Sequence, residues 1–167
     1  MTMLSIELDL DRDLACESTL LPILQRLHET WLDDVRAEIG LALLPHASPW
    51  QRFAAVRYLD TVFRLRLHRE TDAVQAVAYV AAPRRSTALL ATAQMLDLLR
   101  VEIGELSQAP AGEQLVPPLL RAFVQQLEHW CADVEVTLGW IRRDTLAPDT
   151  LARFLHVSEA FAAPTLA

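Results

Sequence analysis

Residues 116–143 read VPPLLRAFVQQLEHWCADVEVTLGWIRR, and the spacing of apolar residues in this stretch decides the fold class. Successive residues of a helix are rotated by about 100°, so apolar residues three or four positions apart share one face. The residues that fall in one arc are Val116, Leu120, Phe123, Leu127, Trp130, Val134, Leu138 and Ile141. The period therefore predicts an amphipathic helix over residues 116–143.

The centre of this stretch, EHWCADVE at 128–135, resembles a metal or thiol site in composition only. His129 and Cys131 are two positions apart, so their side chains point about 160° apart on a helix and cannot bind one metal ion. No basic residue of the same helix lies beside Cys131 to lower the pKa of its thiol. We expect Cys131 to be a small buried apolar residue, and His129 with Asp133 to form a surface pair.

Working towards the N-terminus, a first helix is expected from Ser18 or Thr19 to about Leu44. Either hydroxyl can cap the helix, and Pro22 would then lie in its first turn, where proline is tolerated. One face of this helix carries Leu20, Leu24, Leu27, Trp31, Val35, Ile39 and Ala42.

A second helix is predicted from the sequence SPWQ at 48–51, which combines a capping box with proline at the first helical position. The apolar residues that follow keep a helical phase up to residue 82: Phe53, Val56, Leu59, Phe63, Leu67, Val74, Val77 and Ala81. We interpret 49–82 as one helix of about 50 Å, with a kink near Thr71 as the alternative.

Pro83 ends this helix or opens the next, whose apolar face carries Leu89, Leu96, Leu99, Ile103 and Leu106. Residues 107–114 (SQAPAGEQ) are a predicted loop. A short final helix is expected after Pro148 and Asp149, with Leu151, Phe154, Leu155 and Phe161 on its apolar face. The sequence therefore predicts an all-α fold: an antiparallel bundle of four main helices plus a short C-terminal helix, in a single domain over residues 1–167.

The first sixteen residues differ from the rest, because LSIELDLD at 4–11 alternates apolar and polar residues with the period of a β-strand. A lone strand cannot satisfy its own backbone hydrogen bonds. We expect residues 1–16 to form an extended acidic arm that lies on the bundle or pairs with a second subunit. The alternative is an acidic tail with partial order.

Composition favours self-association. Hydrophobic residues make up 52% of the 167 residues and the mean hydropathy is +0.19, which is more apolar surface than a small monomer readily covers. Several of these residues lie off the predicted apolar faces: Leu65, Val80, Leu98 and Trp140. We therefore expect a homodimer that forms through helical faces.

All fifteen basic residues are arginine, a bias typical of GC-rich bacterial genomes.

Charge and targeting signals restrict the possible partners and the cellular location of the protein. The net charge of −7 and the pI near 5.2 make nucleic acid an unlikely partner, because such binding depends on neutralising phosphates. The N-terminus lacks the basic and apolar regions of a signal peptide, and no apolar run reaches the roughly 18–20 residues of a membrane span. Two cysteines are too few for a disulfide framework. We expect a cytoplasmic protein that does not insert into membranes.

No catalytic motif is present. None of the five histidines has Asp or Glu three residues before it, so the Glu-x-x-His pairs of di-iron bundles are absent. His-Glu-x-x-His, glycine-rich phosphate loops and Gly-x-Ser-x-Gly are also missing. The sequence thus predicts no catalytic residue, metal site or cofactor, and favours a non-catalytic interaction or assembly protein over an enzyme.

The alternative is a ligand-binding or enzymatic bundle with an internal polar site. Three polar residues interrupt the predicted apolar faces: His28, Glu38 and Asp60. A carboxyl at the centre of an apolar face has a raised pKa unless it is paired. Arg64, one turn after Asp60, is the partner that we expect for it.

A third hypothesis rests on the excess of arginine between residues 49 and 85, where seven Arg accompany only three acidic residues. Arg57, Arg64 and His68 are spaced to line up along the helix, and we call these three residues the basic strip. The strip would bind an acidic protein partner. The interpretation that we favour is that these arginines neutralise Asp60 and the acidic first helix, so that replacing Arg57 and Arg64 together would cost several kcal/mol of stability.

Overall fold

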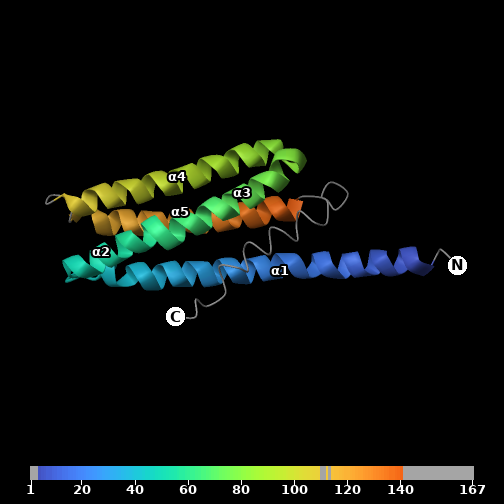
Figure 1. The fold of residues 1–167 in the computed structure, drawn as a ribbon, viewed down its shortest axis with the longest axis horizontal. Coiled ribbons are helices and arrows are strands. Elements are labelled where there is room, and N and C mark those ends of the chain that lie inside the picture. The colour runs from blue at the N-terminus through green and yellow to red at the C-terminus, as the bar shows by residue number, and fades with distance from the viewer. Residues whose placement is uncertain (1–3, 110–111, 113, 141–167) are drawn as a thin grey trace.

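The computed structural model describes residues 4–109, 112 and 114–140. Every element in this part of the chain is helical, which confirms the all-α prediction (Figure 1). The elements are α1 (Leu4–Gly40), a 3-10 turn (Leu41–Leu43), α2 (Pro49–Tyr58), a π-helical turn (Leu59–Phe63), α3 (Arg64–Ala81), α4 (Pro83–Gln108) and α5 (Val116–Trp140). The predicted loop over 107–114 overlaps the connection between α4 and α5, but its first two residues, Ser107 and Gln108, belong to α4. The short C-terminal helix predicted after Pro148 lies outside the described residues.

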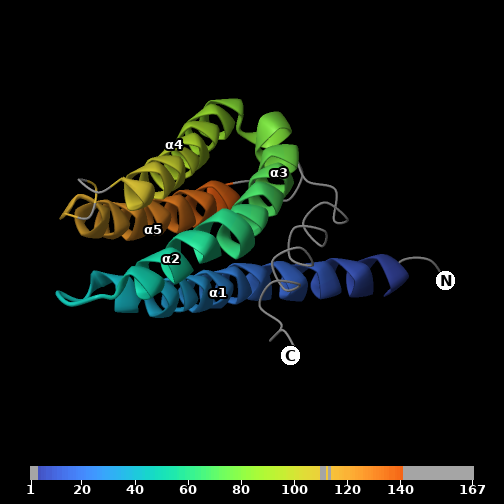
Figure 2. The same ribbon diagram turned by 60° about the vertical axis from the view of Figure 1, so that its left-hand side comes forward.

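The α2–α3 segment connects α1 to α4, and α5 follows α4 along the chain (Figures 1 and 2). α5 contacts both α1 and α4, and α3 contacts α4. α3 and α4 meet at Pro83 and diverge away from this corner, as Figure 2 shows. α1 continues past the ends of the other helices: Gly139, at the end of α5, lies opposite Leu21, so residues 4–20 of α1 extend beyond α5.

The predicted start of α2 is confirmed in detail. The hydroxyl of Ser48 accepts a hydrogen bond from the backbone N–H of Gln51 at 3.3 Å, and the Gln51 side chain accepts one from the Ser48 backbone N–H at 2.7 Å. Pro49 occupies the first turn, where its missing N–H has no intrahelical role. These contacts fix where the chain re-enters the bundle after α1.

Residues 49–81 are helical throughout, but the irregularity is the π-helical turn at 59–63 and not a kink at Thr71. A π turn inserts one extra residue and shifts the phase of the helix around it. The buried face before and through this turn is formed by Ala55, Leu59 and Phe63, while Phe53 is 53% exposed. The predicted phase was wrong at this end because the extra residue of the π turn moves the buried position from Val56 to Ala55.

The core is a cluster of aromatic and aliphatic side chains from α1, the α2–α3 segment, α4 and α5. Trp31 of α1 stacks on Phe63 with ring centroids 5.3 Å apart, and Phe63 meets Phe123 of α5 edge-on at 4.7 Å. The predicted face of α5 is buried at Val116, Leu120, Phe123, Leu127, Trp130 and Val134. Aromatic pairs of this geometry contribute about 0.5–1.5 kcal/mol beyond the area they bury.

The N-terminal prediction is wrong for the residues that the structure describes. Residues 4–16 belong to α1, which runs as one helix to Gly40, so they form neither an extended arm nor a strand. The physical reason is that a strand needs a partner for its backbone, whereas a helix satisfies its backbone hydrogen bonds internally. The same correction applies to the helix start, because Ser18 and Thr19 lie inside α1 and Pro22 is not in its first turn.

Candidate functional site

A polar cluster is buried in the core where α1, α3 and α5 meet. His28 of α1 is 1% exposed, and its two ring nitrogens contact two carboxylates. Nε2 lies 3.0 Å from Oε1 of Glu70, and Nδ1 lies 2.7 Å from Oε1 of Glu135. The indole N–H of Trp130 donates to the same Glu70 oxygen at 3.0 Å. Three helices are thus joined through one imidazole.

The surroundings of His28 keep it protonated. Burial alone would lower its pKa, but the hydrogen bonds and charges of Glu135 and Glu70 raise the pKa of His28 to about 9. Burial would raise the pKa of Glu70, yet the hydrogen bond and charge of His28, followed by Arg66 and Trp130, lower it below its usual value. Near neutral pH the histidine is therefore a cation between two anions, with both N–H groups donated.

Arg66 is the second buried cation of this region. Its guanidinium lies over the ring of Trp31, 4.3 Å from the ring centroid, and donates to the carbonyl of Leu27 at 3.2 Å. Burial lowers the pKa of Arg66, but the charge of Glu70 opposes that effect. Two cations and two carboxylates leave this part of the core without net charge, which is the condition for burying ions at all.

The arrangement holds a proton but does not present it to a substrate. A general base needs a free acceptor nitrogen within reach of a substrate. Both nitrogens of His28 are engaged with carboxylates, and the ring is enclosed in the core. Among the described residues no group of three or more His, Cys, Asp and Glu side chains has the arrangement of a metal site. The cluster is therefore best explained as an ionic link between helices.

Sequence reasoning identified only one member of this cluster. His28 is buried as expected, but Glu38 and Asp60 are exposed and do not join it. Glu70 was missed because it lies in a run of polar residues, 68–72, and Arg66 and Glu135 were not predicted either. The usable signal was spacing: Glu70 continues the series Phe63, Leu67, Glu70, Val74 on the buried face.

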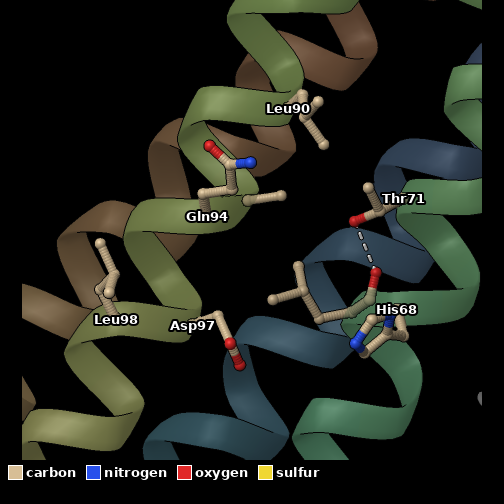
Figure 3. Close-up of a pocket in the computed structure, with 8 residues that line it drawn as sticks. His68, Thr71, Leu90, Gln94, Asp97 and Leu98 are labelled. Carbon is tan, nitrogen blue, oxygen red and sulfur yellow. Dashed lines mark hydrogen bonds between the residues drawn. The ribbon is translucent and has the colours of Figure 1, made fainter.

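A hollow of about 440 Å³ opens where α3 and α4 diverge (Figure 3). α3 and α4 bound it from opposite sides, and its lining residues are Leu67, His68, Thr71, Leu90, Ala93, Gln94, Asp97 and Leu98. The hydroxyl of Thr71 donates to the carbonyl of Leu67 at 2.7 Å, so it serves its own helix. The exposed side chains Leu90 and Leu98 give the hollow an apolar character.

A second hollow of about 370 Å³ lies between α2 and the α4–α5 connection, lined by residues that include Phe53, Arg57 and Asp60. Arg100 of α4 forms an ion pair with one lining residue of each hollow. It pairs with Asp60 of the second hollow, and its Nε lies 2.9 Å from Oδ1 of Asp97 in the first hollow. We call the two hollows together the α3–α4 groove. The predicted Asp60–Arg64 pair is therefore wrong: Arg100, across the groove, is the partner of Asp60.

Two of the three residues of the basic strip line this groove. Arg57 lines the second hollow and His68 lines the first. Both residues and Arg64 are exposed, and no ion pair of Arg57 or Arg64 is found within the described residues. Within the described residues Arg57 and Arg64 therefore do not neutralise a buried carboxylate.

The residues of the 128–135 stretch do not form a reactive site. Cys131 is buried, and burial is the main reason that the pKa of its thiol is raised. His129 and Asp133 are exposed on the far side of α5. Within residues 4–109, 112 and 114–140, no helix is long and apolar enough to span a bilayer.

No protein-family profile, curated protein sequence or solved structure matches this chain.

Proposed function

We propose that the protein is a non-catalytic assembly protein that forms a homodimer through the α3–α4 groove. The observation that carries this proposal is the pair of large apolar side chains on the groove wall, Leu90 and Leu98, of which Leu98 is 63% exposed. Leucine side chains gain about 25 cal/mol per Å² of area removed from water, so a partner that covers them is favoured.

The shape of the groove supports binding of a chain segment. Its two hollows follow α2 and α3 from Phe53 to Thr71, a distance of about 27 Å along a helix at 1.5 Å per residue. Helices that bind in grooves do so by placing apolar residues in successive hollows along such a length. Each of the two hollows has apolar lining residues, Phe53 and Val56 in one and Leu90 and Leu98 in the other, which fits that mode of recognition.

A small-molecule site is the second candidate, favoured by the size of the first hollow. Ligand pockets commonly measure about 300–1,000 Å³ and combine apolar walls with a few polar groups. His68, Gln94 and Asp97 supply such groups. An enzymatic site that uses His28 has less support, because that residue does not line the groove.

The mass of the protein in solution tests the proposal. Light scattering at micromolar concentration should give twice the chain mass of 18.8 kDa. Leu98→Glu, which places a charge on the groove wall, should shift the particle to one chain. Leu41→Glu is the matched control, since Leu41 is 55% exposed on the turn after α1, and it should leave the dimer intact. A wild-type particle of one chain would disprove the homodimer.

A further inference from the structure

The outer face of α4 carries four exposed residues in a line along the helix. Residues seven positions apart on a helix are rotated by only about 20° relative to each other, and helices that pack lengthwise use this spacing. The four exposed residues with this spacing, which we call the α4 stripe, are Arg84, Ala91, Leu98 and Glu105. Met95 and Val101, on either side of Leu98, are exposed as well, so the middle of the stripe is apolar.

The charges at the two ends of the α4 stripe are opposite to those that the helix itself favours. The first turn of α4 contains Arg84 and no acid, and its last turn contains Glu105 and no base. The dipole of a helix favours acids at the N-terminus and bases at the C-terminus. Among the described residues neither Arg84 nor Glu105 forms an ion pair. A partner that carries an acid and a base in the reverse order would compensate both ends.

A second copy of α4 in the antiparallel direction has this reverse order. About a two-fold axis between Gln94 and Met95, Arg84 faces Glu105 of the partner subunit, and Glu105 faces the partner's Arg84. The same register places Ala91 opposite Leu98 of the partner subunit. A small residue opposite a large one lets two helices approach closely.

The α4 stripe is accessible to such a partner. α4 and α1 lie on opposite sides of the bundle in both views (Figures 1 and 2). Gln94 and Leu98 also line the first hollow, as Figure 3 shows, so a helix that packs on the stripe covers the outer edge of the α3–α4 groove. The stripe and the groove are therefore parts of one surface.

We propose that two copies of the protein pack through their α4 stripes in the antiparallel direction, with Arg84 of each copy paired with Glu105 of the other. The apolar middle of each stripe covers that of its partner, and removal of these side chains from water favours the contact. This inference rests on the proposed homodimer and names the helix and the register that form it.

Single charge reversals test the pairing in the full-length chain. Arg84→Glu and Glu105→Arg should each raise the dimer dissociation constant at least about fivefold, because each places like charges at both ends of the contact. Analytical ultracentrifugation measures this constant. Both variants should stay folded, since each gives α4 a charge that its dipole favours, and far-UV circular dichroism verifies their helicity.

Arg26→Glu and Glu29→Arg are the matched controls. They make the same charge changes at exposed positions of α1, which lies on the side of the bundle opposite α4. Each control should leave the dissociation constant unchanged.

A mixture of the two single variants is the decisive measurement. In the heterodimer of Arg84→Glu with Glu105→Arg, opposite charges meet at both ends, whereas like charges meet in each variant's homodimer. The heterodimer should therefore bind at least about fivefold more tightly than either homodimer. The chain with both substitutions should regain the wild-type dissociation constant to within about threefold.

The inference is overturned if either single variant dimerises as tightly as the wild type, which is also the result that a parallel pair of α4 helices would give. It is equally overturned if neither the mixture nor the combined variant dimerises more tightly than the single variants. In both cases a dimer that Leu98→Glu dissociates would still support the proposed function with another element in the groove. A dimer that survives Leu98→Glu would count against the groove itself.

Discussion

The imidazole Nε2 of His28 and the carboxylate Oε1 of Glu70 lie 3.0 Å apart in the core, although 42 residues separate them in sequence. Both residues are 1% exposed. Placing two ions in an apolar core is costly, and attraction compensates only when the geometry is good. The second carboxylate, Glu135, completes this geometry on the other ring nitrogen. The histidine therefore links α1, α3 and α5.

Stability should decrease in alkaline solution because of this histidine. The pKa of His28 is raised from 6.5 to about 9 in the folded chain. A group whose folded pKa exceeds its unfolded value stabilises the fold fully below the unfolded pKa, and this contribution is lost as the pH rises through the folded pKa. The free energy of unfolding should thus fall by about 3 kcal/mol between pH 6.5 and pH 9.5. Urea unfolding at several pH values measures it.

The variant His28→Gln is the control for this pH dependence. Glutamine can keep a hydrogen bond but has no proton to lose, so most of the decrease should disappear from the variant. The decrease that remains close to pH 9 comes from the Cys131 thiol, whose pKa is also raised on folding. An equally steep decrease in His28→Gln would assign the effect to other groups. On the acidic side Glu70 acts in the opposite sense, because its pKa is lowered: its contribution is lost as the pH falls below about 4.5.

The two carboxylates on His28 should contribute unequally. Glu70→Gln leaves a buried cation without its enclosed partner, and breaking such a pair costs about 3–5 kcal/mol. Glu135→Gln should cost clearly less, because the Glu135 side chain is 22% exposed and water can replace part of its interaction. Denaturant unfolding of the two variants at pH 7 compares them. Equal losses would mean that burial does not control the strength of these pairs.

The helices could be predicted from sequence because their signals are local. The capping box at Ser48 and the apolar face of α5 follow from nearest neighbours along the chain, and the structure confirms both. The π turn at 59–63 could not be predicted, because one extra residue leaves the composition of the helix unchanged. It did change which residues are buried, and the phase at Phe53 was therefore wrong.

The polar contacts could not be predicted because they join distant parts of the chain. Asp60 has Arg64 one turn away, yet it pairs with Arg100 from α4. The spacing along the helix predicted Arg64 as the partner, whereas the packing of α4 against α3 places Arg100 beside Asp60. Glu70 was likewise missed, since its partners His28 and Trp130 lie on other helices.

Cys131 should be unreactive in the folded protein. Thiolate is the reactive form, and burial raises the pKa of this thiol far above its ordinary value. In the variant Cys16→Ser, where Cys131 is the remaining cysteine, a thiol reagent should label native protein at pH 8 at least about 100-fold more slowly than protein unfolded in denaturant. Labelling at the unfolded rate would show that the thiol is accessible. The comparison uses one chain in two states, so intrinsic reagent reactivity cancels.

The arginines of the second helical segment should divide into structural and surface residues. Arg57 and Arg64 are exposed, so Arg57→Ala/Arg64→Ala should change the free energy of unfolding by no more than about 1 kcal/mol, opposite to the loss that the sequence suggested. Arg66→Ala should cost about 2–4 kcal/mol, since it removes the group over Trp31 and leaves Glu70 with less compensating charge.

Thermal and denaturant unfolding of both variants should be measured at a protein concentration low enough to keep every variant in the same oligomeric state. A loss of several kcal/mol in the Arg57/Arg64 variant would mean that the basic strip supports the fold, and the strip would then no longer be a surface available to a partner.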